Sequence, residues 1–375
     1  MDQKKLRTWA EIDLGALEHN YRILRKKIPY TCRFLGLCKA DAYGHGAVEI
    51  GLKLQELGAD MLAVACLDEG LELRKHGITI PILCLGETPV EAARLLVEQD
   101  MIQMVGDLMY GKALSEVSQK TEKPVVIHIK IDTGMGRLGF LWDEAHKTQT
   151  LQELEELCHL EGIYAQGVFT HFSCADCDEA FTTLQLERFQ QVKEELEKKK
   201  IYLSNYHCAA SAATLSYPQT HMDMVRPGIA LYGYDPTGQE NHLLKPVMTV
   251  KSRITTVRTV PEGWSVSYGG TVKLKKETKL AVIPIGYGDG YPRILSNRTT
   301  MLVRDIPCPV VGRICMDMCM IDVSQVPDVQ EGEQVTVYNG ALIQEAAQKT
   351  DTIVYEILCS VGKRVPRVYV SSVSK

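Results

Sequence analysis

The sequence predicts an α/β protein with an N-terminal (β/α)8 TIM barrel followed by a C-terminal mainly-β domain. Three observations support this. Eight apolar, β-rich segments recur up to about residue 233, with helical patterns between them. Several of these segments are nearly continuous apolar runs, as in strands that are covered on both faces of a parallel sheet. From about residue 234, short strand-like segments alternate with turn residues and few helices.

The barrel strands and helices follow one another along the chain. Apolar residues three and four apart predict helices in "GAVEIGLKLQEL" and "TPVEAARLLVEQ". The stretch "EAFTTLQLERFQQVKEELEKKK" predicts a long amphipathic helix. The eight predicted strands are 33–39, 61–67, 80–86, 101–106, 124–132, 163–172, 203–209 and 222–233.

The second domain begins after a polar, turn-rich linker, "DPTGQENHLLKP". Short strands are expected in "VMTVKSRITTVRTV", "KLAVIPIGYG", "TMLVRDIPCPVVG", "MCMIDVS" and "EQVTVYNG", with one helix in "LIQEAAQKT". We therefore expect a barrel domain at 8–236 and a β domain at 245–375, with residues 1–7 associated with the β domain.

Composition excludes several classes of protein. The chain has 375 residues, a net charge of −5 and no Lys/Arg block, so no nucleic-acid partner is expected. No apolar run approaches the ~18 residues of a membrane span, and the N-terminus lacks the apolar core of a signal peptide. We expect a cytoplasmic protein, away from membranes, whose 12 cysteines are thiols. No metal is expected, because Cys174-x-x-Cys177 beside His171 lacks the matching second pair of a structural zinc site.

Lys39 closes the first predicted barrel strand. It should therefore lie at the carboxyl-terminal mouth, where barrel enzymes keep their active sites. A desolvated lysine can have a lowered pKa, which suits Schiff-base chemistry. A lysine paired with Asp41 in a salt bridge is the alternative.

The stretch "KIDTGMGRLGF" contains a Gly134-x-Gly136-x-x-Gly139 pattern that matches the dinucleotide-binding fingerprint. However, it follows the fifth strand rather than the first, and the next strand ends in "GVFTHF" without an acid for a ribose. A glycine-rich active-site loop that presents Arg137 is favoured, because arginine holds planar carboxylates well. A surface salt bridge remains the alternative for Arg137.

The last two barrel strands carry a second set of candidates. Ser211 in "HCAASAATL" and the backbone of Gly228 and Ile229 follow strands seven and eight, whose loops often bind phosphate through N–H groups. Arg226 could contact a cofactor's phosphate or ring. Close helix packing is the alternative for the small residues. In the β domain, tyrosines and Met316 beside glycines suggest a second wall of a site.

Taken together, these segments resemble the alanine racemase family of pyridoxal phosphate (PLP) enzymes over nearly the whole chain. "CKADAYGHG" together with "GRICMD" is highly specific. The resemblance implies an isomerase that interconverts L-alanine and D-alanine. It also implies a supply of D-alanine for peptidoglycan and cell wall biogenesis, and a homodimer with a shared active site. The other matching motifs are "AEIDLGALEHNYR", "KIDTGMGRLGF", "THFSCAD", "MVRPGIALYG", "SVSYGGT", "GYGDGYPR", "GRICMDMCMIDV" and "KRVPRVYV".

The resemblance also implies two catalytic bases. Lys39 would attach PLP covalently and act on one face of Cα. Tyr268, from the partner subunit's β domain, would act on the other face. Arg226, hydrogen-bonded to His207, would face the pyridine nitrogen and keep it unprotonated.

The remaining contacts are implied in the same way. Arg137 and the Met316 amide would bind the substrate carboxylate. In this family a lysine placed like Lys130 can be carbamylated, and the resulting anion would orient Arg137. The PLP phosphate would be held by Tyr43, Ser211, the amides of Gly228 and Ile229, and Tyr355.

Two positions bear on the details. The family often has Asn before the phosphate-binding serine, where this chain has Ala210, which puts one polar contact in doubt. A related serine-racemising group looks to have Asn in place of Tyr355, and the tyrosine of this chain favours alanine by its bulk. Because selection by the size of one small group is limited, a serine or broad-specificity racemase is the first alternative. A PLP carrier without turnover and a decarboxylase of the same architecture are the others.

Overall fold

The computed structural model describes residues 5–121, 123–238 and 243–371. The chain forms two compact units. The barrel unit comprises Glu18–Ala42 and Ala47–Leu244, and the β unit comprises Met1–Leu17, Tyr43–Gly46 and Lys245–Lys375. The domain limits expected from the sequence stay a prediction. Residues 1–4, 239–242 and 372–375, which fall in the expected domains and linker, lie outside the described residues.

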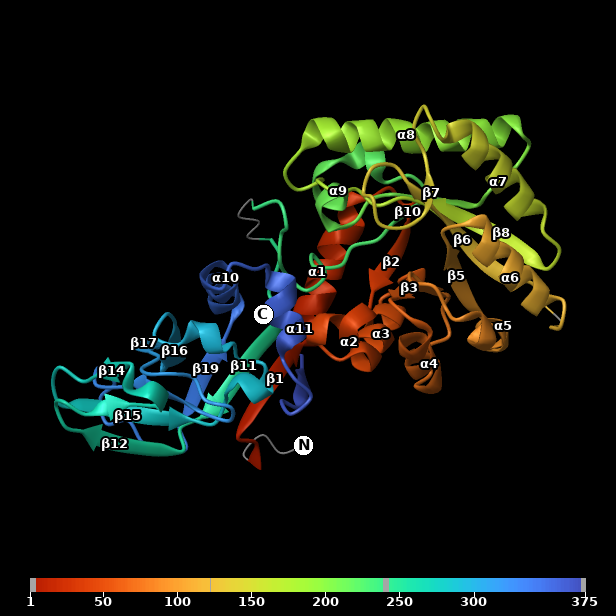
Figure 1. The fold of residues 1–375 in the computed structure, drawn as a ribbon. Helices are drawn as coiled ribbons and strands as arrows, with labels where there is room; N and C mark the ends of the chain where they lie inside the picture. Colours follow the sequence, from red (N-terminus) through yellow and green to blue (C-terminus); the bar gives the residue numbers. More distant parts are fainter. Residues whose placement is uncertain (1–4, 122, 239–242, 372–375) are drawn as a thin grey trace. The chain divides into compact units, whose positions relative to one another are not determined.

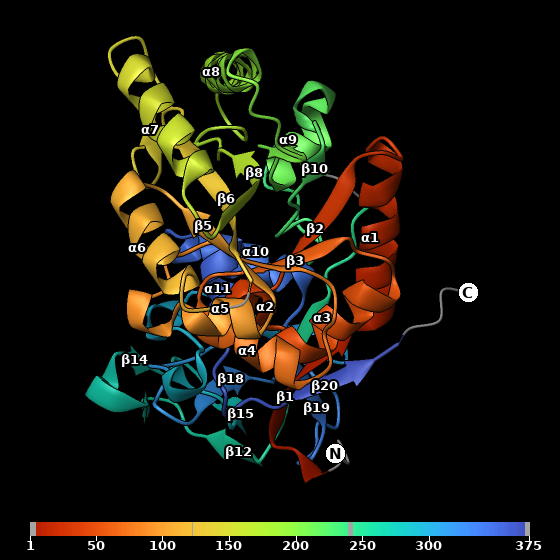
Figure 2. The same cartoon turned by 90° about the vertical axis from the view of Figure 1, so that its right-hand side faces the viewer.

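The barrel unit contains eight parallel strands in the order β10-β2-β3-β4-β5-β6-β8-β9. Figure 2 labels β10, β2, β3, β5, β6 and β8 of this sheet. Between β9 and β10, backbone bonds from Asp223 N to Tyr206 O (3.1 Å) and from Arg226 N to Ala209 O (2.8 Å) join the two ends of this order. The predicted (β/α)8 barrel is therefore confirmed. The strands are β2 (Arg33–Leu37), β3 (Met61–Val64), β4 (Ile82–Cys84), β5 (Met101–Val105), β6 (Val125–Asp132), β8 (Ile163–Phe169), β9 (Asn205–His207) and β10 (Met224–Val225).

Helices pack outside these strands because each carries one apolar stripe. In α3 (Ala47–Glu56), the buried residues Ala47, Ile50, Gly51 and Leu54 follow the spacing i, i+3, i+4, i+7. The other helices that lie wholly or partly in the barrel unit are α1 (Leu14–Lys27), α2 (Lys39–Gly44), α4 (Leu67–Lys75), α5 (Arg94–Glu98), α6 (Leu108–Ser118), α7 (Lys147–His159), α8 (Glu179–Lys198) and α9 (Ser211–Ser216).

The eighth strand is much shorter than the predicted segment 222–233. It ends at Val225, because Pro227 has no N–H for a strand ladder. The chain then folds into turns, with Leu231 N donating to Gly228 O at 2.8 Å. Arg226, Gly228 and Ile229 consequently lie just beyond the carboxyl end of a barrel strand.

The β unit is mainly β, as predicted. Its largest sheet has the order β17-β16-β19-β11-β1-β20, in which β1 pairs antiparallel with β11 and parallel with β20. Figure 1 labels β17, β16, β19, β11 and β1 of this sheet. Smaller sheets join β12-β15-β18 and β13-β14. The elements are β1 (Thr8–Asp13), β11 (Met248–Arg253), β12 (Thr256–Val260), β13 (Ser265–Val266), β14 (Val272–Lys273), β15 (Thr278–Ile283), β16 (Thr300–Val303), β17 (Ile306–Pro309), β18 (Cys319–Asp322), β19 (Gln334–Tyr338), β20 (Arg367–Val370), α10 (Gly340–Lys349) and α11 (Val354–Ser360).

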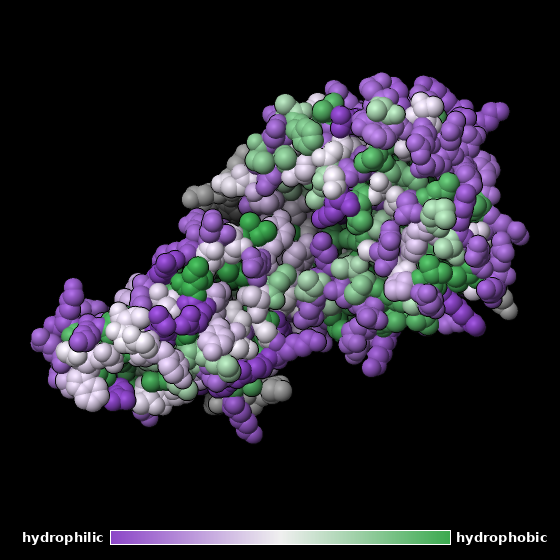
Figure 3. Space-filling model, in the orientation of Figure 1, coloured by the Kyte–Doolittle hydropathy of each residue, from purple (hydrophilic) through white to green (hydrophobic). Residues whose placement is uncertain are grey.

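Among the described residues, every helix is too short or too polar to cross a bilayer. The face drawn in Figure 3 mixes hydrophilic and hydrophobic residues.

Candidate active site

Lys39 begins an unusual turn. Strand β2 ends at Leu37, and the next helical segment, α2, is left-handed. Residues 40–43 have φ between 52° and 53°, and Gly44 has φ 79°. A left-handed conformation costs roughly 1–2 kcal/mol for each non-glycine residue. Such a turn persists only where its surroundings hold it in place.

Hydrogen bonds from the barrel unit hold this turn. Glu69 accepts the Ala40 N–H through Oε1 and the Ala65 N–H through Oε2, both at 2.7 Å. Asp41 Oδ1 accepts the Ala47 N–H at 2.8 Å and so caps α3. Glu69 is a supporting residue that sequence reasoning missed, because nothing in the local pattern connects it with the turn. Lys39 itself is half-buried.

Strand β6 lines the barrel interior with polar groups. His128, Lys130 and Asp132 alternate in "HIKID", so they point to one face. All three are buried, at 0%, 4% and 4% exposure. Sequence reasoning named only Lys130. The two-residue spacing of polar side chains in a buried strand was a signal that could have found the other two.

Lys130 is a buried amine. Its Nζ donates to Ile131 O at 2.7 Å and lies 5.6 Å from the centre of the Phe169 ring. Burial lowers the pKa of Lys130 to about 7; Asp132 opposes this, and nearby arginine charges add to it. Gly139, with φ +112°, packs against Lys130, because an added Cβ would lie 2.6 Å from Lys130 O. Much of this amine is therefore uncharged just above neutral pH.

Asp132 shapes the loop that presents Arg137. Its carboxylate accepts the N–H groups of Gly134 (2.9 Å), Met135 (2.7 Å) and Arg137 (3.0 Å). Burial acts to raise the pKa of Asp132, but these backbone bonds lower it below its usual value. Arg137 is exposed, and no carboxylate pairs with it in the described part of the chain.

The glycine pattern of this loop lacks what dinucleotide binding needs. After Gly139 the chain enters β7 (Phe140–Leu141), which pairs with β6, instead of a helix. The fingerprint works by placing a pyrophosphate at a helix N-terminus. The loop therefore lacks the strand–turn–helix context of the dinucleotide fingerprint, and the role of Arg137 stays a prediction.

Arg226 fixes the protons on a chain of buried histidines. Its Nη1 lies 3.0 Å from His207 Nδ1, and a guanidinium can only donate. His207 must therefore carry its proton on Nε2, which donates to His128 Nδ1 at 2.9 Å. His128 Nε2–H then points to Gln166 Oε1 at 3.4 Å. Burial lowers the pKa of His128 to about 4 and that of His207 well below its ordinary value, so both rings are neutral.

The second terminal nitrogen of the Arg226 guanidinium, Nη2, is also hydrogen-bonded. Arg226 Nη2 donates to Thr170 O (2.8 Å), His171 Nδ1 (3.2 Å) and Cys208 O (3.3 Å). Burial lowers the pKa of Arg226 to about 10, so it stays charged at neutral pH. For Arg226 Nε–H, no acceptor lies within hydrogen-bond distance among the described residues. The Nε–H of Arg226 can therefore donate to a ligand. The groups that hold the Arg226 side chain are neutral histidine rings and backbone carbonyls.

His171, weighed above as a metal ligand, accepts a hydrogen bond from Arg226. Burial, followed by the positive charges of Arg226, Lys130, Arg137 and Lys39, holds the pKa of His171 well below its ordinary value. Cys174 and Cys177 lie in the next turn, where Cys177 N donates to Cys174 O at 3.0 Å. His171 thus belongs to the arginine–histidine network.

A cradle for an anion lies beside Arg226. Ser211 Oγ accepts the Gly228 N–H (2.9 Å) and the Ala230 N–H (3.2 Å). The Gly228 amide, expected to bind phosphate, is thus engaged by the serine. In the described residues neither the Ser211 hydroxyl proton nor the Ile229 N–H has an acceptor. Two neighbouring donors of this kind fit phosphate oxygens, so these residues fit PLP. Ala210 supplies no side-chain cap to α9.

The remaining candidates lie on the β unit. The rings of Tyr43 and Tyr355 meet edge to face, with centroids 5.8 Å apart, and Tyr43 is buried. Tyr268 is 71% exposed and Met316 is 53% exposed. The predicted site residues therefore form two groups. Lys39, Lys130, Arg137, His207, Ser211, Arg226, Gly228 and Ile229 lie on the barrel unit, and Tyr43, Tyr268, Met316 and Tyr355 lie on the β unit.

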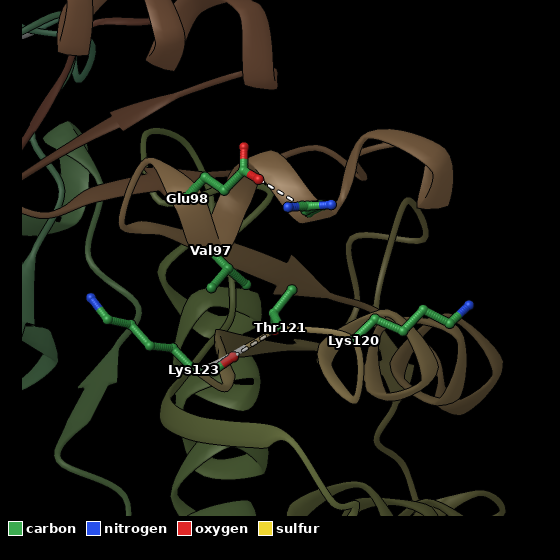
Figure 4. Close-up of a pocket in the computed structure, with 6 residues that line it drawn as sticks. Val97, Glu98, Lys120, Thr121 and Lys123 are labelled. Atoms are coloured by element: carbon green, nitrogen blue, oxygen red, sulfur yellow. Dashed lines mark hydrogen bonds and ion pairs between the residues drawn. The ribbon is translucent and has the colours of Figure 1, made fainter.

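A cavity of about 390 Å³ lies elsewhere on the barrel unit, lined by α5 and by the segment that leads into β6. Figure 4 shows its two lysines, Lys120 and Lys123, directed away from each other. Arg94, also in its lining, is paired with Glu98 at 2.6 Å. Because it lies at the amino ends of the strands, this cavity is not a candidate active site.

A barrel with a lysine at the carboxyl ends of its strands, a cradle for an anion and, within the described residues, an arginine without a carboxylate partner fits the class of PLP-dependent enzymes. The chain belongs to the alanine racemase family. Residues 12–236 match the family's model "Alanine racemase, N-terminal domain", and residues 247–369 match "Alanine racemase, C-terminal domain".

Full-length relatives agree with this assignment. The alanine racemase of Desulfosudis oleivorans is 45% identical over 374 residues, covering 96% of each chain. A solved alanine racemase from Clostridium difficile 630 superposes with a TM-score of 0.93 at 36% identity, covering 98% of this chain and 96% of that one. A solved alanine racemase from Bartonella henselae, with covalently bound pyridoxal phosphate, has a TM-score of 0.87 at 29% identity, covering 97% and 100%. The predicted family, fold, enzyme class and cofactor are confirmed.

Proposed function

We propose that this chain interconverts L-alanine and D-alanine with PLP bound at Lys39. The observation that carries the proposal is Arg226, a charged arginine held by the neutral His207 and by carbonyl groups, with no carboxylate beside it in the part of the chain that the structure describes. Bound PLP supplies an electron sink for the carbanion at the substrate Cα. Arg226 can only donate a hydrogen bond, so it keeps the ring nitrogen unprotonated, which weakens the sink and disfavours side reactions.

Two bases move the α-proton. Lys39 acts at one face of Cα and Tyr268 at the other, so one takes the proton and the opposite conjugate acid returns one. Arg137 and the Met316 amide orient the substrate through its carboxylate. Ser211 and Ile229 would donate hydrogen bonds to the PLP phosphate, and Tyr43 and Tyr355 would add two further contacts to it.

Chiral analysis of the PLP-loaded protein tests this function. L-alanine should be converted to the racemate, with a higher kcat/KM than L-serine or L-lysine. Tyr355 favours alanine by its bulk, although a single small group gives limited discrimination, about 10–200-fold. Equal or faster turnover of serine would identify a broad-specificity racemase, and release of carbon dioxide would indicate a decarboxylase.

We also infer that a second copy of this chain completes the site. On the β unit, Tyr268, Trp264 and Met316 are 71%, 57% and 53% exposed, and a cavity of about 470 Å³ lies beside Trp264 and Tyr268. A cluster of exposed aromatic and apolar side chains is typical of an interface. The partner's Tyr268 would then act with Lys39.

Subunit mixing tests the shared site. Lys39→Ala and Tyr268→Phe should each be inactive as homodimers. When they are co-expressed, the heterodimer contains one intact site, because the isologous pairing combines Lys39 of one chain with Tyr268 of the other. We expect the racemisation rate to recover to about a quarter of the wild-type rate with random pairing. No recovery in a mixture shown to contain heterodimers would place both bases in one chain.

Lys130 is the proposed site of carbamylation. The neutral amine adds to carbon dioxide with loss of a proton, giving an anion that would orient Arg137. Burial lowers the pKa of Lys130 to about 7, so incorporation of isotopically labelled carbon dioxide should rise as the pH passes upward through about 7. Lys130→Met should show no such signal. Absence of label in the wild-type protein above this pH would contradict the assignment.

The activity is proposed to lie in the cytoplasm and to supply D-alanine for peptidoglycan. Buried thiols support a reducing compartment. Burial raises the pKa values of Cys38 and Cys208 to about 12.

A further inference from the structure

Ser267, the residue before Tyr268, has an unusual backbone conformation. Its φ is 66° and its ψ is −174°, a region that is populated almost only by glycine. Strand β13 ends at Val266, and a 3-10 turn begins at Tyr268. The strained residue therefore determines the direction in which the chain delivers the tyrosine. Strain of this kind persists only where neighbouring contacts hold it.

Two side-chain hydrogen bonds hold Ser267. Its Oγ donates to Arg313 O at 2.6 Å, and Cys315 Sγ lies 3.4 Å from Ser267 Oγ. The two segments pack closely, because a Cβ on Gly312 would lie 2.7 Å from Val266 O. Gly312 has φ +79°, so a side chain there would also be strained.

The segment that accepts this bond is itself fixed. We refer to residues 312–316 as the Met316 loop. Four hydrogen bonds from two neighbouring turns fix its backbone, so Ser267 is attached to a rigid support. They are Gly312 N to Asn297 Oδ1 (2.6 Å), Ile314 N to Ser296 Oγ (2.9 Å), Tyr287 N to Cys315 O (3.1 Å) and Gly288 N to Met316 O (2.9 Å).

We propose that Ser267 is a positioning residue, which fixes the Tyr268 turn relative to the Met316 loop. The proposal rests on the proposed function, in which Tyr268 moves a proton while the Met316 amide binds the substrate carboxylate. The bond from Ser267 Oγ to Arg313 O then sets the distance between the base and the bound substrate. Misplacing a reacting group by about 1 Å can cost about 10²-fold in rate.

Two substitutions of Ser267 distinguish an effect on the position of Tyr268 from an effect on the stability of the fold. Ser267→Ala removes the hydroxyl and keeps the strain, whereas Ser267→Gly removes the hydroxyl and tolerates the backbone conformation. In deuterated water, both variants should racemise alanine about 10- to 100-fold more slowly. Lys39 alone can remove the α-proton of one alanine enantiomer and return a deuteron to the same face. This exchange with retained configuration should persist in both variants. The rate of α-proton exchange divided by the rate of racemisation should therefore rise in both Ser267 variants. Ser324→Ala, which removes another hydrogen-bonded hydroxyl of the β unit, is the matched control and should leave the ratio unchanged.

A purely structural role predicts a different result. Exchange and racemisation would then fall together in Ser267→Ala, and Ser267→Gly would restore both; that outcome overturns the proposal. Tyr268→Phe distinguishes this failure from that of the proposed function. If Tyr268→Phe raises the ratio while the Ser267 variants match the wild-type enzyme, only the role of Ser267 is wrong. If Tyr268→Phe racemises alanine at the wild-type rate, both assignments are wrong.

Discussion

Replacing Lys39 with alanine is expected to abolish alanine racemisation and the visible absorption of covalently attached cofactor. Loss of a general base alone costs about 10²–10⁴-fold, and Lys39 also provides the attachment point. The measurements are the absorption spectrum after reconstitution with PLP and the rate of L-to-D conversion. Lys147→Ala, at a half-buried lysine that begins α7 and pairs with Glu144, should keep both signals.

Lys39→Arg tests whether a positive charge at this position is enough for activity. A guanidinium stays protonated in proteins, so it can neither attach the cofactor nor accept the α-proton. We expect the same loss of activity and absorption as in Lys39→Ala, with a similar thermal unfolding midpoint to the wild-type protein. Retained racemisation in either variant would contradict the role of Lys39.

Tyr268→Phe should lower racemisation by about 10²–10⁴-fold in both directions. Each direction needs a base on one face of Cα and an acid on the other, so loss of one phenol blocks both. Cofactor absorption should remain, because the proposed cofactor contacts do not include Tyr268. Initial rates from L-alanine and from D-alanine, measured separately, check this prediction.

The control for this variant is Tyr202→Phe. Tyr202 is 75% exposed on the barrel unit, close to the 71% of Tyr268, so both substitutions remove a phenol from an exposed position. Tyr202→Phe should leave the rates unchanged. A Tyr268→Phe enzyme that is fully active in both directions would disprove the two-base assignment.

Two backbone conformations that shape the site could not be predicted from the sequence. Nothing in "KADAYG" predicts a left-handed turn, but residues 40–43 have positive φ and Glu69 accepts the Ala40 N–H. Helical propensity does not report the sign of φ, and the supporting carboxylate is 29 residues away from Ala40. The strained backbone of Ser267 is hidden in the same way, because its partner Arg313 is 46 residues away.

The sequence by itself determined the eight barrel strands, the position of Lys39 after the first of them and the loop that presents Arg137. These follow from local periodicity and from the rule that parallel strands share one carboxyl edge. Only the tertiary structure decided the proton positions on His207 and His128 and the engagement of the Gly228 amide by Ser211. These depend on contacts between distant strands: His128 and His207 are 79 residues apart. A hydrogen bond between them exists only after β6, β8 and β9 have paired side by side.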